Sequence, residues 1–174
     1  MQKILKITTI IDKISHYVAK ISMLFLWILC FLVFSLAVAL NFSLVSSKLD
    51  DFSLYCFALM ILLSFSYTLK ENKHVRLDLV YMRYSQKTKL WSWFVVNCFF
   101  ILPFCAVIMK YGYDFAWQSY NISESSPNGG IPYYFIFKSF VVWGFFFLGL
   151  QALSEGLKAL VALINPNSNL TLNL

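Results

Sequence analysis

The chain has 174 residues, of which 60% are hydrophobic and 13% charged, with a mean hydropathy of +0.70. Soluble domains contain about 45–50% apolar and about 25% charged residues, so this composition argues against a soluble domain. The formal net charge is +6. The basic residues flank apolar stretches and form no stripe on a soluble module, which argues against a nucleic-acid-binding protein.

Residues 3–20 form an amphipathic segment. On a helical wheel its aliphatic residues share one face, and polar residues such as Lys6, Asp12 and Lys13 lie opposite. The pattern predicts a helix in the cytoplasmic membrane interface, with its lysines near anionic headgroups. Packing of the apolar face on a partner's helix is the alternative. The aliphatic face consists of Ile4, Ile7, Ile11, Ile14, Val18 and Ile21.

Four apolar stretches follow, at residues 21–45, 52–69, 90–109 and 133–164. A bilayer core of ~30 Å takes ~20 helical residues to cross, and lipid offers no hydrogen bonds to bare backbone. We therefore predict an all-α integral membrane protein with four transmembrane helices in a single membrane domain, residues 1–164. The first stretch is too long for the apolar region of a cleavable signal peptide. The polar tail, residues 165–174, is expected to be disordered.

The basic residues predict the topology. Eleven of the 14 lysines and arginines lie before the first stretch, between the second and third, or near the end of the fourth. By the positive-inside rule, both termini and the loop at residues 70–89 are cytoplasmic. The loops at residues 46–51 and 110–132 then face outward.

Local signals refine the helix ends. Asp50 and Asp51 directly precede the second stretch, where acidic groups meet the positive end of the helix dipole, and we interpret them as a cap rather than an ion site. Pro103 lies within the third stretch and leaves the carbonyl of Phe99 without its helical donor, which predicts a kink. Pro132 suits the first turn of the fourth helix.

The fourth stretch carries a stripe of small residues, which predicts close helix–helix packing in lipid. Gln151 and Glu155 flank this stripe, one turn apart. The spacing of Glu155 and Lys158 predicts an ion pair within the helix, and a buried contact with another subunit is the alternative. The stripe consists of Gly149, Ala152, Gly156 and Ala159.

Catalytic and metal-binding patterns are absent from the sequence. There is no phosphate-binding glycine loop, no HExxH motif and no nucleophile elbow, and the four cysteines form no CxxC pair. Ionisable residues, which mark transport pathways in membranes, do not occur near the middle of the first three stretches. We predict no catalytic residue, no cofactor and no metal, and a helper that packs against a larger protein. A self-assembling four-helix channel or a small membrane-embedded enzyme is the alternative.

Two segments carry a family resemblance. One runs from His74 to Tyr81 directly after the second stretch, and the other runs from Glu124 to Pro132 and leads into a helix with Lys138 and Gly144. With four spans and cytoplasmic termini, these segments resemble the small membrane subunit of tripartite ATP-independent periplasmic (TRAP) transporters, the DctQ family. The resemblance covers roughly residues 10–163.

The resemblance implies a non-catalytic subunit in the bacterial inner membrane. It would brace a large multi-span subunit that carries substrate and sodium, and help a periplasmic substrate-binding protein to dock during organic-acid uptake. His74, Arg76 and Asp78 match the family's cytoplasmic turn. The candidates for partner contact are Asp50, Asp51, Asp114, Glu124, Gln151 and Glu155.

Overall fold

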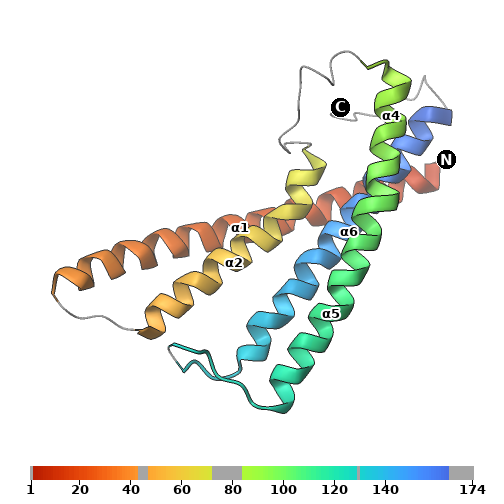
Figure 1. Cartoon of the computed structure of the whole chain (residues 1–174). Coiled ribbons are helices and arrows are strands. Elements are labelled where there is room, and N and C mark those ends of the chain that lie inside the picture. Colours follow the sequence, from red (N-terminus) through yellow and green to blue (C-terminus); the bar gives the residue numbers. More distant parts are fainter. Residues whose placement is uncertain (1, 43–46, 72–83, 129, 165–174) are drawn as a thin grey trace.

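The computed structural model describes residues 2–42, 47–71, 84–128 and 130–164. All regular elements in these ranges are helical (Figure 1): α1 (Gln2–Asn41), α2 (Ser47–Lys70), α4 (Gln86–Val95), the π-helix η1 (Val96–Ile101), α5 (Leu102–Asn121) and α6 (Tyr134–Ile164). Segments α4, η1 and α5 continue one another, so four helices are long and apolar enough to cross a membrane. The predicted all-helical class with four long apolar helices is confirmed.

Helix α1 differs from the sequence expectation, because the amphipathic segment and the first apolar stretch form one uninterrupted helix. No glycine or proline occurs between Gln2 and Asn41 to end it. The face of α1 that is buried carries Thr8, Ser15 and Ser22, whereas Ile7 and Ile21 are exposed. Small polar side chains, rather than isoleucines, therefore contact the rest of the chain. The interfacial placement of the first residues stays a prediction.

The third long helix also runs further than expected. It continues through residues 110–121, which the sequence analysis assigned to the outer loop, and ends at Asn121. Its π-helical turn lies directly before Pro103, and there the N–H of Leu102 donates to the carbonyl of Asn97, five residues earlier. The side chain of Asn97 is fully buried and donates to the carbonyl of Trp93 at 2.8 Å. The third helix thus has a wider turn close to Pro103, and the kink predicted at Pro103 stays a prediction.

Helix α6 is the centre of the bundle. It contacts α1, α2 and each segment of the third helix, and Figure 1 shows it between α2 and α5. At Gly144 an added Cβ atom would lie 2.8 Å from the Cβ of Leu62 and 3.2 Å from its carbonyl oxygen. The absence of a side chain at Gly144 therefore permits the close approach of α2 and α6.

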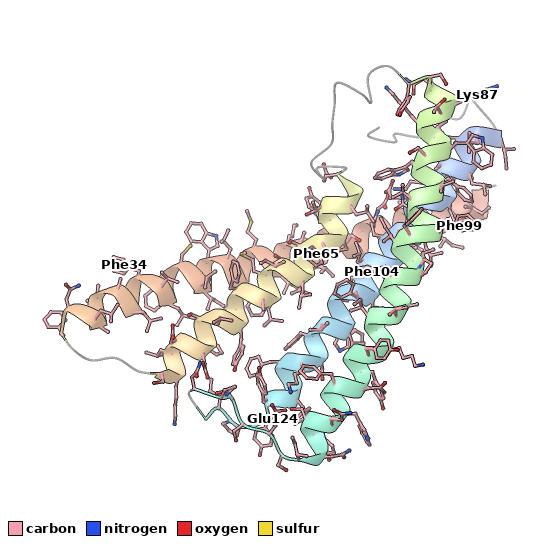
Figure 2. The ribbon with its side chains drawn as sticks, viewed as in Figure 1. Phe34, Phe65, Lys87, Phe99, Phe104 and Glu124 are labelled. Atoms are coloured by element: carbon pink, nitrogen blue, oxygen red, sulfur yellow. The ribbon has the colours of Figure 1, made fainter. Side chains whose placement is uncertain are left out.

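Some aromatic side chains contact rings on neighbouring helices, and others project outward from α1 (Figure 2). Phe145 of α6 packs between Phe65 and Phe104, with ring centroids 6.1 and 5.7 Å away. On α1, by contrast, Phe31 and Phe34 are 72% and 70% exposed, and Phe34 projects from the part of α1 that diverges from α6. Much of the apolar surface of α1 is thus left for lipid or another protein.

Candidate functional site

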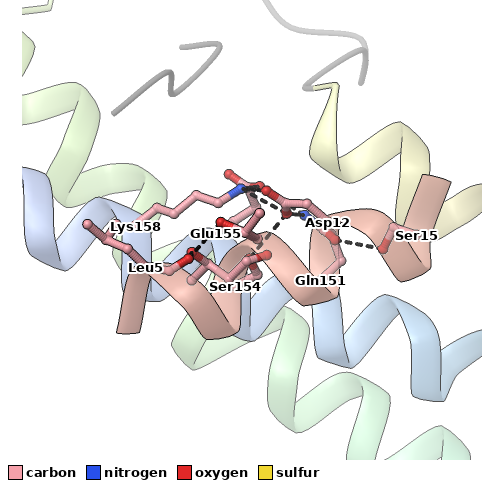
Figure 3. A network of polar contacts seen from close by, with 9 residues as sticks. Leu5, Asp12, Ser15, Gln151, Ser154, Glu155 and Lys158 are labelled. Atoms are coloured by element: carbon pink, nitrogen blue, oxygen red, sulfur yellow. Dashed lines mark hydrogen bonds and ion pairs between the residues drawn. The ribbon is translucent and has the colours of Figure 1, made fainter. Parts of the chain in front are cut away.

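A hydrogen-bonded cluster joins α1 to the C-terminal half of α6 (Figure 3). Gln151 lies at its centre: its Oε1 accepts from Ser15 Oγ at 2.6 Å, and its Nε2 donates to Asp12 Oδ1 at 3.0 Å. The same Nε2 donates to Glu155 Oε1 at 2.9 Å. We call this set the α1–α6 cluster; it consists of Asp12, Ser15, Gln151, Ser154, Glu155 and Lys158.

Lys158 supplies the positive charge of the α1–α6 cluster. Its Nζ lies 2.8 Å from Asp12 Oδ2 and 2.8 Å from Glu155 Oε1, so the expected Glu155–Lys158 pair is present. The residues on α6 are buried, with Gln151 fully covered and Glu155 4% exposed. Removing charges from water is costly unless they are paired and hydrogen-bonded, and here both carboxylates share one ammonium and the Gln151 amide. The cluster is a structural joint between α1 and α6.

The small-residue stripe occupies a different face of α6. Ala152 and Ala159 are fully buried. An added Cβ at Gly149 would lie 3.5 Å from Cys105 Cβ, and one at Gly156 would lie 2.8 Å from Cys98 Sγ. The stripe therefore packs against η1 and α5 of the same chain.

A second polar cluster ties the loop before α6 to the start of α2. Ser126 Oγ donates to Asp51 Oδ2 at 2.5 Å and accepts from the backbone N–H of Ile131 at 3.0 Å. Asn128 Nδ2 lies 3.3 Å from the other oxygen of Asp51. Asp51 is only 5% exposed, so this candidate for partner contact is engaged within the chain.

Glu124 anchors the same loop to α6. Lys138 Nζ donates to Glu124 Oε2 at 2.5 Å and lies 3.8 Å from the ring centroid of Phe115. The Lys138 ammonium holds the pKa of Glu124 below its ordinary value. Figure 2 places Glu124 at the loop end of the bundle, beside α5 and α6. Like Asp51, Glu124 has an internal partner.

The other predicted site residues divide into two groups. Asp50 and Asp114 are exposed, and no described side chain pairs with either of them. His74, Arg76 and Asp78 lie outside the described residues. Across the described ranges, no group of three or more His, Cys, Asp or Glu side chains is arranged to hold a metal ion. All four cysteines are free.

Sequence reasoning missed the residues of α1 that meet α6 and, at Ser22, α2. Thr8, Ser15 and Ser22 recur at an interval of seven, which is the period of a helix–helix seam, and Asp12 lies on the same face. This repeat was the available signal. It was masked by the more conspicuous row of isoleucines.

The comparisons with known proteins decide the family. The family model of the DctQ component of tripartite ATP-independent periplasmic transporters matches residues 35–161, most of the chain. The chain belongs to this family. No curated protein and no solved structure shows significant similarity to it.

Membership in the DctQ family makes the chain a small membrane component of a TRAP transporter. The family implies association with the large TRAP subunit and a substrate-binding protein, and it is a family of transporter components rather than of enzymes. The resemblance seen in the sequence is thus confirmed. The matched region includes both contact faces of α6 and excludes Asp12 and Ser15, which lie before it.

Proposed function

We propose that this DctQ chain is a non-catalytic brace for the large TRAP subunit and widens the docking surface for the binding protein. The large subunit would carry an organic acid together with sodium across the bacterial inner membrane. In this arrangement both termini and the loop at residues 70–89 are cytoplasmic, and the loop before α6 is periplasmic.

The placement of charge carries this proposal. Residues 21–42, 52–69, 90–109 and 139–154 contain no Asp, Glu, Lys or Arg. The buried charges lie outside these ranges, in the α1–α6 cluster and around Asp51 and Glu124, and they bond within the chain. Ionisable groups that bind cargo lie inside the membrane and face a pathway. The described part of this chain offers surfaces for adhesion instead.

The surface of α1 supports a bracing role. Trp27, Phe31 and Phe34 are each at least 70% exposed and lie on neighbouring turns. Aromatic side chains bring large contact area at little conformational cost, which suits a permanent contact between membrane proteins. We assign the large subunit's contact to this part of α1.

The outward surface supports docking. Asp50 and Asp114 are exposed carboxylates, Asp50 in the first turn of α2 and Asp114 in the last two turns of α5, which leads into the loop that carries Glu124. They would meet basic groups of the binding protein, since complementary charges speed association. At the opposite end, Arg76 and Asp78 with His74 would order the cytoplasmic turn by hydrogen bonds to nearby carbonyls or headgroups.

Purification from the native membrane tests the proposal. A tagged chain is expected to carry with it a stoichiometric large membrane protein, and removal of the chain is expected to abolish uptake of the organic acid. Liposomes containing the chain alone are expected to be inert. Ion conduction or solute accumulation by such liposomes would instead favour a self-assembling channel.

The docking role has its own test. The double variant Asp50→Asn/Asp114→Asn is expected to slow association of the binding protein and to flatten its salt dependence, with assembly of the membrane subunits unchanged. Lys110→Gln, a charge change on an exposed residue of the same helix as Asp114, is the matched control. Equal association rates for the double variant and the wild type would refute this contact.

A further inference from the structure

Two adjoining hollows run along the line where α1 meets α2. The larger one has a volume of about 520 Å³ and is lined mainly by apolar side chains, among them Met23, Leu26 and Met60. The second is polar, and its basic residues are Lys13, Lys20 and Lys70. Both hollows include His16 and Lys20, so they form one groove that is apolar at one end and cationic at the other.

The groove is built from fixed helix surfaces. Ser22 Oγ donates to the carbonyl of Met60 at 2.7 Å, which joins α1 to α2 along the apolar part. At the cationic end the rings of His16 and Tyr67 meet across the two helices, with centroids 5.9 Å apart. The groove therefore exists before any ligand arrives.

The charge at the cationic end is not neutralised by the described residues. None of their carboxylates lies within 4.0 Å of the ammonium groups of Lys13, Lys20 or Lys70. Asp12 lines the same hollow, but its carboxylate is bound to Lys158 and Gln151. Glu71 follows Lys70 in the chain and does not line the groove. An anion in the groove would meet three ammonium groups and the neutralised Asp12, with the Glu71 carboxylate beyond them at the hydroxyl of Tyr67.

We propose that the groove binds a phospholipid with an anionic headgroup. The phosphate lies between Lys20 and Lys70, whose ammonium groups donate charge-assisted hydrogen bonds to its oxygens. One acyl chain follows the apolar hollow past Met23 and Met60. The volume lies within the ~300–1,000 Å³ of ordinary ligand sites.

The groove is apolar at one end and cationic at the other, and this favours a phospholipid over two other occupants. Free phosphate would use the lysines but leave the apolar hollow unfilled. A membrane-spanning helix would fill the apolar hollow but would cover unpaired ammonium groups, which is costly. A phospholipid satisfies both ends at once. This inference goes beyond the bracing role and does not depend on it.

A photoactivatable phosphatidylglycerol, with its reactive group on the acyl chain, tests the site in the purified full-length chain. We expect crosslinks concentrated on Met23, Leu26 and Met60. The same lipid with a phosphatidylcholine headgroup is expected to label these residues weakly. Labelling spread evenly over the exposed face around Phe31 and Phe34 would show only general lipid contact and would overturn the proposal.

Native mass spectrometry with added phosphatidylglycerol measures how much the cationic end of the groove contributes to lipid binding. A lysine near a headgroup contributes ~1 kcal/mol, so Lys20→Gln/Lys70→Gln is expected to weaken binding about 30-fold. Lys110→Gln is the control, because its ammonium also lies over a ring, that of Tyr111, but outside the groove. Equal affinity of the double variant and the wild type would refute the headgroup assignment.

Filling the apolar hollow tests the acyl chain separately. Ala19→Phe is expected to reduce the crosslinks at Met60 at least tenfold, whereas Ala37→Phe, at an exposed site on the same helix, leaves them unchanged. The same crosslinking on the assembled complex gives a further outcome. Loss of the lipid crosslinks at Met60 in the complex would assign the groove to a partner and overturn the proposal.

Discussion

Helix α6 and residues 23–41 of α1 are both long and apolar. Helix α6 packs within the bundle, whereas residues 23–41 of α1 are largely exposed. On α6, Gly144 and Gly156 let neighbouring helices approach, while residues 23–41 of α1 contain no glycine. Leu32 is the one residue among these that is buried. Apolar character places a helix in lipid, and small residues decide whether it packs there.

Polar groups reinforce the difference. The half of α6 beyond Gln151 exchanges hydrogen bonds and an ion pair with the first turns of α1, whereas residues 23–41 of α1 make no side-chain hydrogen bond to another described element. Helix α1 is therefore bound to α6 at its N-terminal end and exposed at its C-terminal end. Four sets of substitutions break or sharpen this contrast.

Lys158→Met is expected to have the largest effect. It leaves Asp12 and Glu155 facing each other without a cation, and breaking a buried ion pair costs about 3–5 kcal/mol. Because the Asp12 side chain is 22% exposed, we expect the lower end, about 3 kcal/mol of the free energy of unfolding. Unfolding by SDS titration in detergent measures it. Lys110→Met, at an exposed lysine, should cost almost nothing, and equal losses in the two variants would contradict a structural role for the cluster.

Gly144→Ala and Gly149→Ala form a matched pair on α6. At Gly144 the new methyl group would lie 2.8 Å from Leu62 Cβ, and overpacking of this kind costs about 1–3 kcal/mol. At Gly149 the nearest atom is 3.5 Å away, an ordinary contact, so the better helix propensity of alanine should stabilise by up to about 1 kcal/mol. The same SDS titration measures the free energy of unfolding of both variants. Two changes of the same sign would show that the contact at Gly144 does not limit the α2–α6 distance.

Acidification tests the loop end of α6. The pKa of Glu124 is lowered in the folded chain, so its contribution is present above the ordinary pKa of about 4.3 and is lost as the pH falls through the lowered value. Melting temperatures at pH 7 and pH 3 should therefore differ less for Glu124→Gln than for the wild type. Asp114→Asn, at an exposed carboxylate, should retain the full difference; a reduction as large as that of Glu124→Gln would contradict the Lys138 pairing.

Phe34→Ala is expected to have the smallest effect on the chain itself, within about 0.5 kcal/mol, since Phe34 projects outward. Phe145→Ala removes two aromatic contacts of about 0.5–1.5 kcal/mol each and should destabilise measurably. Under the bracing proposal, Phe34→Ala nevertheless lowers the yield of large subunit that co-purifies. If multiple substitutions on the exposed face around Phe34 left the yield of co-purified large subunit unchanged, the large subunit would have to contact another surface of the chain.

Much of the fold followed from the sequence. The start of the last helix was expected at Tyr133 and lies at Tyr134. The prediction that Pro132 lies in the first turn of this helix is wrong, because Pro132 lies two residues before its start and Tyr133 between them has a positive φ of 61°. The spacing of Gly149 and Gly156 predicted a helix-packing face, and its role in assembly stays a prediction. In both cases the signal is local, since it needs only a few residues on one helix.

The remaining features depend on contacts between distant segments. The pairing of Asp12 with Lys158 and of Asp51 with Ser126 joins residues 146 and 75 positions apart, and no local pattern encodes such a register. The continuity of α1 and the extension of the third helix to Asn121 were missed for another reason. Apolar stretches mark where lipid begins and ends, but a helix continues beyond them until a residue breaks it.

The π-helical turn at Val96–Ile101 determines the direction in which the later side chains of the third helix point. A π turn holds an extra residue relative to an α-helix, so the side chains from Leu102 onward are rotated by about 100° from where a regular helix would point them. Deleting one residue from this turn would swing Cys105 and Ala116, now buried, away from α6. A deletion within this helix is therefore tolerated only together with an insertion that restores its length. The π-helical turn thus fixes the rotation of the helix in an otherwise uniform apolar sequence.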